Sequence, residues 1–353
     1  MAGIYVHFPF CASRCIYCDF YSRVRKDWTE YAEALERELI QNSDYFRGVP
    51  PSTLYFGGGT PSLLPANLLS EVAECARKTF GVDNFEEFTI EANPDDVTPE
   101  SVRAWKKMGV NRVSMGVQSF DDGHLRWMRR RHSAAQVSEA VAALRAEAMT
   151  EFSIDLIFGF TGLSHEQWDA NINAALALCP PHISCYQMTG RWAHESEELC
   201  REQYLHLQRR LEDAGYEHYE VSNYALKGHR SRHNSAYWDR TAYLGIGAAA
   251  HSFDGLDTRR WNVADIDRYI AGEKAQSEVL SAREAVEEMV MLSLRTSDGL
   301  ELSSLPDEIV CKMKPALSQM ARTGNLILEG DTVVIPSDKL FISDWIISRL
   351  IVD

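Results

Sequence analysis

The sequence predicts an α/β fold, with a parallel sheet or barrel in the first two thirds and a smaller unit at the C-terminus. Two observations support this prediction. Short apolar runs alternate with segments of helical period, and repeated strand–helix units are typical of parallel sheets and barrels. From about Gln276 onward the pattern changes to helical segments followed by a hairpin.

The expected strands are short apolar runs. The first run covers residues 4–6, and the later ones cover residues 53–56, 87–90, 112–115, 152–158 and 182–187. Apolar runs of this length indicate strands that are buried in a parallel sheet.

The expected helices lie between these strands, at residues 28–42, 66–80, 99–108, 133–147 and 165–178. Local capping residues support two of them. Thr98 stands at an N-cap position, with Pro99 as the first helical residue. Ser164 precedes a helical segment whose third residue, Gln167, completes a capping box.

The composition excludes several classes of protein. The 353 residues carry a net charge of −15, and an acidic chain is a poor candidate for general nucleic-acid binding. No apolar run approaches the roughly 20 residues that an integral membrane span needs, and the N-terminus shows no secretory signal. The five cysteines outside the N-terminal cluster are scattered along the chain, so we expect reduced thiols and a cytoplasmic protein.

Three cysteines in the spacing C-x₃-C-x₂-C are the most informative motif. Cys11, Cys15 and Cys18 follow the first strand and supply three thiolates from one short loop. A [4Fe–4S] cube normally takes four Cys ligands, so three local ligands leave one iron open for a small molecule. The alternatives are a zinc site and an accidental cluster of cysteines. Zinc sites usually add a second distant pair of Cys or His ligands, and the sequence has no second C-x₂-C.

This cysteine spacing resembles that of the radical S-adenosylmethionine (SAM) enzymes. The stretch from Tyr5 to Cys11, Tyr-Val-His-Phe-Pro-Phe-Cys, further resembles the opening of the oxygen-independent coproporphyrinogen III oxidase-like family. The resemblance implies an incomplete β/α barrel that is open on one side, with a [4Fe–4S] cluster whose open iron binds SAM. In such barrels the catalytic groups gather at the C-terminal ends of the strands.

The resemblance also implies a set of SAM-binding residues at successive strand ends. The set comprises Tyr5, Tyr17, Gly58, Gly59, Thr60, Glu91, Gln118, Arg130 and Asp155. Each residue alone has a structural alternative. Tyr17 could pack the loop, the glycines could form a tight turn, Arg130 could belong to a solvated helix face, and Asp155 could cap a neighbouring backbone.

Phe20 distinguishes between two branches of this family. Coproporphyrinogen dehydrogenases resemble C-x₃-C-x₂-C-x-C and carry a longer N-terminal extension, whereas this chain has Phe20 at the last position. In both respects, the cysteine pattern and the N-terminal extension, this chain resembles the heme-chaperone branch instead. The sequence therefore favours a protein that binds heme as cargo and delivers it to acceptor hemoproteins, including those of the respiratory chain. A tetrapyrrole-acting radical SAM enzyme is the runner-up, and an interaction module with a vestigial SAM site is a third interpretation.

A candidate heme site lies further along the chain. His233, Tyr237 and Trp238 belong to an H-N-x-x-Y-W stretch that resembles the heme-chaperone branch. Histidine is a common axial ligand of heme and aromatic rings pack on the macrocycle. Alternatively, His233 is structural and the two aromatic residues fill the open side of the barrel. His7, His251 or a free cysteine would then be the remaining candidates for the iron ligand.

The predicted domain organisation has a radical SAM core at residues 1–255, a linker at 256–275 and a winged-helix-like α+β domain at 276–353. The C-terminal domain has an amphipathic helix at 284–295 and a hairpin at 326–335 with a turn at Gly330 and Asp331. It lacks a dense basic face, so we expect it to cover the barrel or to contact a partner. The sequence is compatible with a homodimer. The loop at 189–197 is shorter than is usual in the family, which affects the expected substrate mouth.

Overall fold

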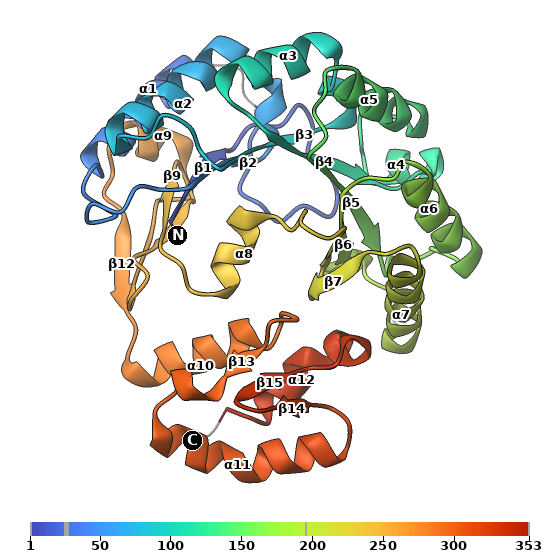
Figure 1. Ribbon diagram of the computed structural model, residues 1–353. Coiled ribbons are helices and arrows are strands. Elements are labelled where there is room, and N and C mark those ends of the chain that lie inside the picture. The colour runs from blue at the N-terminus through green and yellow to red at the C-terminus, as the bar shows by residue number, and fades with distance from the viewer. Residues whose placement is uncertain (1, 25–27, 195, 352–353) are drawn as a thin grey trace.

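A curved sheet of 12 strands dominates the computed structural model, which describes residues 2–24, 28–194 and 196–351 (Figure 1). Six parallel strands form its centre in chain order: β1 (Gly3–Phe8), β2 (Thr53–Gly58), β3 (Glu87–Ala92), β4 (Arg112–Gln118), β5 (Phe152–Phe158) and β6 (His182–Gln187). They confirm all six strands expected from the sequence.

The two edges of the sheet are built differently. Beside β1 lies the parallel strand β9 (Tyr243–Ile246). Beyond β9 the sheet continues with antiparallel pairs through β10 (His251–Phe253), β11 (Thr258–Trp261) and β12 (Gln276–Val279). Beside β6 lies an antiparallel pair, β8 (Asn223–Ala225) and β7 (Glu217–Glu220). In the described residues the strand order runs from β12 at one edge to β7 at the other, which gives the open arc expected of an incomplete barrel.

Helices cover the outer, convex face of this arc (Figure 1). They are α1 (Thr29–Gln41), α2 (Ala66–Phe80), α3 (Pro99–Met108), α4 (Asp122–Trp127), α5 (Ala134–Ala146), α6 (His165–Ala177) and α7 (Glu197–Asp213), with α9 (Ile266–Ile270) beside α1. Short 3₁₀ turns lie at η1 (Pro61–Leu63), η2 (Pro94–Asp96) and η3 (Gly190–Trp192). The five expected helices are confirmed. The predicted caps are also present, since Thr98 accepts from the Ser101 amide and Ser164 from the Gln167 amide, each at 3.2 Å.

The central strands have a period of two that places polar side chains inside the arc. On β4, Val113 and Met115 are fully buried, whereas the alternate residue Ser114 lines an internal cavity. On β5, Ile154 is fully buried and Asp155 faces the same cavity. Successive side chains of a strand point to opposite faces, so the outward positions form the core under the helices and the inward positions form a polar interior.

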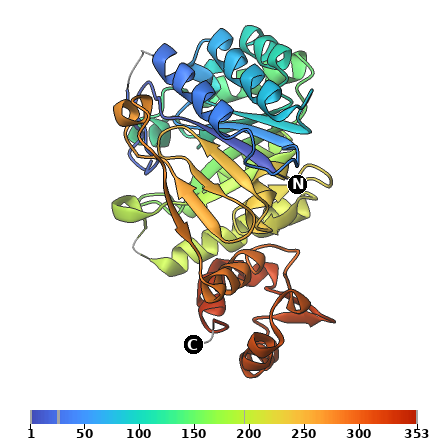
Figure 2. The same cartoon turned by 90° about the vertical axis from the view of Figure 1, so that its left-hand side faces the viewer.

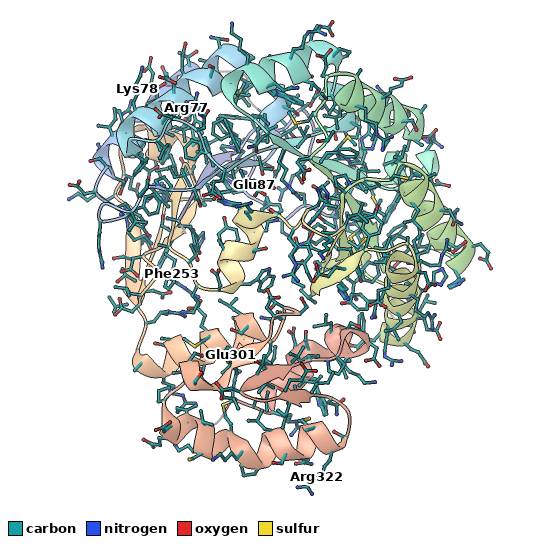
Figure 3. All side chains as sticks on the ribbon, viewed as in Figure 1. Arg77, Lys78, Glu87, Phe253, Glu301 and Arg322 are labelled. Carbon is teal, nitrogen blue, oxygen red and sulfur yellow. The ribbon has the colours of Figure 1, made fainter. Side chains whose placement is uncertain are left out.

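Helix α8 (Arg232–Trp238) lies inside the arc instead of closing its open side (Figure 1). Glu87, at the start of β3, accepts hydrogen bonds from the backbone amides of Arg232 at 2.9 Å and His233 at 2.8 Å. A carboxylate at the amino end of a helix satisfies amides that have no partner within the helix. Figure 3 shows Glu87 next to α8. Since Glu87 is the first residue of β3, this contact lies opposite to the strand ends that carry the motifs.

The C-terminal unit is a small α+β fold, as expected. Its helices are α10 (Ala282–Ser293), α11 (Asp307–Arg322) and α12 (Ser343–Ser348), with 3₁₀ turns η4 (Leu302–Ser304) and η5 (Ser337–Ile342). Its sheet has the order β13 (Leu300–Glu301), β15 (Thr332–Val334), β14 (Ile327–Glu329), which confirms the hairpin. Residues 256–275, expected as a linker, contain β11 and α9 instead, and β12 still belongs to the main sheet.

This C-terminal unit packs across the open side of the arc (Figures 1 and 2). Glu288 on α10 forms ion pairs with Arg240, which follows α8, and with Arg259 on β11. On the other side, the rings of Tyr204 and Phe341 lie 5.4 Å apart. Of the two roles expected for this unit, covering the barrel is therefore the one observed. Within the described residues, no helix combines the length and apolar character that crossing a bilayer requires.

Candidate functional site

A cavity of about 600 Å³ occupies the interior of the arc. It extends from the cysteine loop, through the inward faces of β3 to β6, to Asn234 on α8. Residues that the sequence placed far apart share this one space. They include Cys11, Cys15, Tyr17, Cys18, Phe20, Gly58, Gly59, Thr60, Glu91, Gln118, Arg130 and Asp155.

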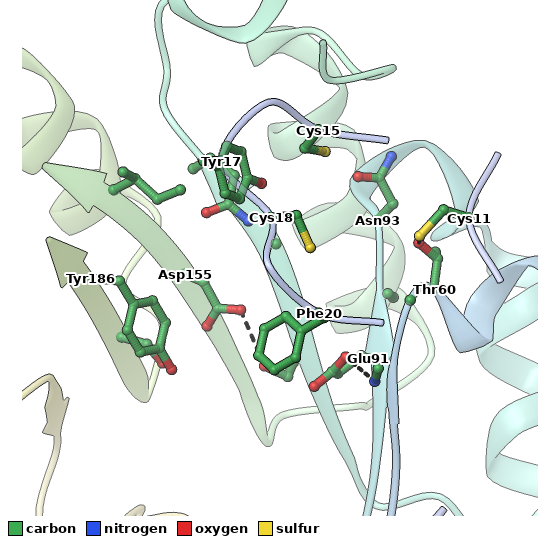
Figure 4. Close-up of a pocket in the computed structure, with 18 of the residues that line it drawn as sticks. Cys11, Cys15, Tyr17, Cys18, Phe20, Thr60, Glu91, Asn93, Asp155 and Tyr186 are labelled. Atoms are coloured by element: carbon green, nitrogen blue, oxygen red, sulfur yellow. Dashed lines mark hydrogen bonds between the residues drawn. The ribbon is translucent and has the colours of Figure 1, made fainter. Parts of the chain in front are cut away.

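The three cysteines lie on a loop that is held at both ends. The Cys11 amide donates to the Arg23 carbonyl at 3.1 Å, and the Ile16 amide donates to the Met128 carbonyl at 3.3 Å. Figure 4 shows the three sulfur atoms around one side of the cavity. Arg130 Nη1 lies 3.5 Å from Cys15 Sγ, so a cation stands where thiolate charge would develop.

This donor set fits an iron–sulfur cube with one open iron. The three cysteines are free thiols that line one cavity. Their sulfur atoms do not meet at one point, because no three His, Cys, Asp or Glu side chains of the described chain are grouped to hold a single metal ion. The ligands of a four-iron cube bind different irons, so such a cube needs a shared cavity and not a shared point.

The glycine turn after β2 brings the backbone against the cysteine loop. A Cβ atom on Gly59 would lie 2.5 Å from the Phe10 carbonyl oxygen, so only glycine fits there. Gly58 has a φ of 111°, and its amide donates to Glu91 Oε2 at 2.9 Å. Thr60 Oγ1 lies 3.9 Å from Cys11 Sγ. The turn therefore connects the cluster loop to the carboxylate on β3.

Two carboxyl groups face the cavity with raised pKa values. Burial raises the pKa of Glu91 to about 7, although the Tyr55 hydroxyl donates to it at 3.0 Å. Burial likewise raises the pKa of Asp155 to about 6, and Ser114 Oγ lies 3.5 Å from its Oδ2. The other oxygen of Asp155 has no hydrogen-bond partner among the described residues. A carboxyl group in this state is ready to accept a hydrogen bond from a ligand.

Arg130 joins the cysteine loop to the strand ends. It donates to the side chain of Asn93 and to the carbonyl of Gly116, and its Nη1 lies 3.4 Å from the Tyr17 hydroxyl. Gln118 has a φ of 68° at an irregularity in the pairing of β4 with β5. A non-glycine residue in the left-handed region costs conformational energy, and such residues cluster at functional sites.

All the residues of the predicted SAM set line the cavity except Tyr5. The Tyr5 hydroxyl lies 3.0 Å from His7 Nδ1, and its ring centroid lies 5.8 Å from that of Tyr55. Because His7 Nε2 donates to the Tyr21 carbonyl, Nδ1 is the acceptor for Tyr5. Tyr5 thus supports the wall of the cavity from behind Tyr55.

The predicted heme residues lie at the other end of the arc. His233 is 2% exposed, with Nδ1 at 2.8 Å from Thr53 Oγ1 and Nε2 at 2.9 Å from the Tyr237 hydroxyl. Neither His233, Tyr237 nor Trp238 lines the cavity. Since an axial ligand needs one ring nitrogen free to bind iron, these contacts favour the structural alternative for His233. Its role as a heme ligand stays a prediction.

Sequence reasoning missed several polar residues of the cavity, including Tyr55, Asn93 and Ser114. Asn93 follows Glu91 by two positions, and the period of a strand puts both on one face. The same period relates Ser114 to Gln118. The signal was therefore present in the sequence, as polar residues at alternate positions within runs that were interpreted as apolar throughout.

Comparison with known proteins places the chain among relatives of similar length. Residues 5–175 match the radical SAM superfamily. The heme chaperone HemW of Synechocystis is 34% identical over 86% of this chain and 80% of the relative. HemW of Bacillus subtilis is 34% identical, with 85% of each chain covered. A mitochondrial radical SAM domain-containing protein of Danio rerio is 30% identical over 85% of this chain and 74% of the relative.

A solved structure confirms the fold. The coproporphyrinogen III oxidase of Escherichia coli, a radical SAM enzyme, superposes with a TM-score of 0.86 over 99% of this chain and 90% of that chain. The sequence identity is 21%, which supports a shared fold and says nothing of a shared reaction.

Proposed function

Since this chain belongs to the HemW family of heme chaperones within the radical SAM superfamily, we propose that it binds heme and delivers it to acceptor hemoproteins. The observation that carries this proposal is one cavity that joins three cluster-type cysteines, the strand-end residues of a SAM site, and Phe20. Phe20 occupies the position of the fourth cysteine in the C-x₃-C-x₂-C-x-C pattern of the dehydrogenase branch.

The residues of the cavity have distinct roles in this proposal. Cys11, Cys15 and Cys18 would hold the [4Fe–4S] cluster, which when bound supplies an open iron and an electron. Arg130 offsets the charge of the thiolates. Glu91 and Asp155 accept hydrogen bonds from the polar groups of SAM, and the glycine turn lets the backbone approach that ligand without side-chain obstruction.

The second candidate function is a redox reaction on coproporphyrinogen III or another tetrapyrrole. The observation that favours it is the fold shared with the E. coli oxidase over nearly the whole chain. Phe20 argues against this redox function, because a phenyl ring cannot replace the thiol that the dehydrogenase pattern has at this position.

Anaerobic incubation with SAM, a reductant and either heme or coproporphyrinogen III separates the two functions. We expect a stable heme complex with a Soret band and no decarboxylated product. Formation of protoporphyrinogen IX would establish the second function. An unchanged electron paramagnetic resonance spectrum of the cluster at saturating SAM would contradict the SAM site itself.

The identity of the partners is a further part of the proposal. We propose acceptor hemoproteins of the respiratory chain as recipients of heme, and the cytoplasm as the location. The eight cysteines are all unpaired, which is compatible with a reducing compartment. Co-purification of heme-free acceptor proteins with the heme-loaded chain tests the first part.

A further inference from the structure

Two aromatic side chains, Phe20 and Tyr186, lie among the residues that line the cavity (Figure 4). Together with Arg14 and Arg129 they belong to the exposed part of its lining, and we call these four residues the mouth of the cavity. Phe20 is 66% exposed and stands two residues beyond the third cysteine. Tyr186, on β6, is 42% exposed and belongs to a different wall of the same cavity. Large exposed aromatic residues that share a concave surface typically mark a ligand site, because water is a poor neighbour for both rings.

The same mouth carries arginine side chains with no acidic partner. Arg14 and Arg129 both line the cavity, and no ion pair joins either of them to another residue of the described chain. Neighbouring Arg131, in contrast, pairs with Asp95 at 3.2 Å and with Asp96 at 2.9 Å. Arg14 donates only to the Cys18 carbonyl, at 3.5 Å, so both guanidinium groups keep donors that are directed at no carboxylate of the described chain. A concave site that holds two such arginines favours an anionic ligand.

Backbone geometry indicates that Arg129 is held in place. Its φ is 60°, in the left-handed region that disfavours residues with a Cβ atom. The segment is fixed on both sides, since the Arg130 amide donates to the Leu125 carbonyl at 2.9 Å and the Met128 carbonyl accepts from the cysteine loop. The fold thus maintains a conformation that presents Arg129 beside the loop.

We propose that heme docks at this mouth, with its ring between Phe20 and Tyr186 and its propionates on Arg14 and Arg129. Heme combines a flat apolar ring with two carboxylates on one edge, and the mouth offers aromatic surface together with two arginines. This inference rests on the proposed heme-chaperone function and specifies the surface that performs it, at the cluster end of the arc and not at α8.

The iron of a heme in this position has no ready histidine ligand. Among the described residues that line the cavity, His182 is the sole histidine. Its Nε2 lies 2.7 Å from the Tyr219 hydroxyl and its Nδ1 has no partner in the described chain, but the residue is 1% exposed and begins β6, at the end of the arc opposite to the cysteine loop. Heme would then be held by its faces and its carboxylates. Such contacts break one at a time, which suits a protein that must release its cargo to an acceptor.

Heme titration of the reconstituted protein in the presence of SAM tests the inference. Phe20→Ala should weaken binding about tenfold, and Phe20→Trp should bind nearly as well as the parent. The double variant Arg14→Gln/Arg129→Gln should lose about two- to fivefold, and added salt should reduce that difference.

Two control variants match these changes. Val24 is also 66% exposed but does not line the cavity, so Val24→Ala should leave heme affinity unchanged. Arg126 lies on α4, exposed and outside the cavity, and Arg126→Gln should likewise have no effect. Iron and sulfide content of each variant reports whether the cluster loop is intact.

The outcomes separate this inference from the function on which it rests. If the parent protein binds no heme, the proposed function fails. If the parent binds heme and Phe20→Ala and the arginine variant bind equally well with an intact cluster, heme lies elsewhere and this inference is wrong. Should Phe20→Ala lose its cluster, Arg129→Gln alone decides the question, with a loss of affinity supporting the mouth and parent affinity refuting it.

Discussion

The two ends of the cavity differ in how their polar groups are satisfied. At the cluster end, Asp155 Oδ1 and Arg130 Nε are buried without hydrogen-bond partners in the described chain, and three thiols face open space. At the α8 end, His233 uses both ring nitrogens and Glu87 accepts from two backbone amides, although Arg112 Nη2 and His182 Nδ1 have no partner in the described chain. The cluster end therefore combines unsatisfied buried groups with three open thiols, whereas the hydrogen bonds of His233 and Glu87 at the other end join strands and helix.

This difference assigns function and stability to separate places. In β/α barrels the C-terminal ends of the strands carry the chemistry, and the N-terminal ends carry the stability. Unsatisfied buried groups are unfavourable until a ligand binds them, so the fold tolerates them where binding repays the cost. Substitutions at the cluster end should therefore impair binding of the cluster or of a ligand, whereas substitutions at the α8 end should lower the stability of the fold.

The largest expected effect is at the cysteine loop. Changing Cys11, Cys15 and Cys18 together to Ser should abolish the iron–sulfur cluster, because a hydroxyl is a poor ligand for iron in place of a thiolate. Anaerobic reconstitution with analysis of iron and sulfide measures this. A full cluster in the triple variant would show that the ligands are elsewhere.

Gly59→Ala should disrupt the cysteine loop by forcing its backbone to move. The new Cβ would lie 2.5 Å from the Phe10 carbonyl oxygen, so the cysteine loop would have to move. We expect a large loss of cluster occupancy, measured as bound iron per chain. Gly81→Ala is the matched control: its φ of 64° makes Ala unfavourable by about 1 kcal/mol, but no atom lies within 4 Å. Equal cluster occupancy in both variants would contradict the packing argument.

The raised pKa of Glu91, about 7, should give the cluster end a pH dependence. Because the folded protein binds this proton more tightly than the unfolded chain, the stabilisation is complete below the ordinary pKa of Glu and is lost as pH rises through 7. Glu91→Gln should remove the share of the slope that Glu91 contributes, on the order of 3 kcal/mol, whereas Asp155, whose pKa is raised to about 6, keeps its own share.

Denaturation of the reconstituted, SAM-free protein at several pH values between about 5 and 8 measures the slope. The exposed residue Glu33 provides the control, and Glu33→Gln should retain the slope of the parent. Identical slopes for the parent and Glu91→Gln would show that Glu91 is not the group that titrates.

The smallest expected effect concerns the α8 end. His233→Ala should lower the free energy of unfolding by about 2 kcal/mol, because Thr53 and Tyr237 lose a buried partner. Cluster content and the Soret band of added heme should stay as in the parent. Exposed His251 is the control, since His251→Ala should change stability by less than about 0.5 kcal/mol. A shifted Soret band in His233→Ala would restore His233 as a heme ligand.

The sequence predicted the central strands, their parallel arrangement and most of the residues that line the cluster end of the cavity. These features follow from local signals: cysteine spacing, glycines after a strand, and caps such as Thr98. They also follow from the rule that strand ends of parallel units meet at one edge of a sheet. Local signals therefore sufficed where each functional residue directly follows its own strand.

Features fixed by distant partners were not predictable in this way. The position of α8 depends on Glu87, which is 145 residues before Arg232 in the chain. The extension of the sheet to β12 depends on pairing with β11 and not on a strong apolar pattern, since all four residues of β12 are exposed. Tyr5 was expected at the cavity because it belongs to the opening motif, but its side chain bonds to His7 instead.

The hydrogen bond between Ile16 and the Met128 carbonyl has a consequence for biosynthesis. The segment that supports the cysteine loop, with Arg130, is synthesised more than a hundred residues after the three cysteines. Chains are made at roughly 5–20 residues per second, so the thiols spend several seconds without their support. We therefore expect the iron–sulfur cluster to be inserted only after residues 128–130 have been made.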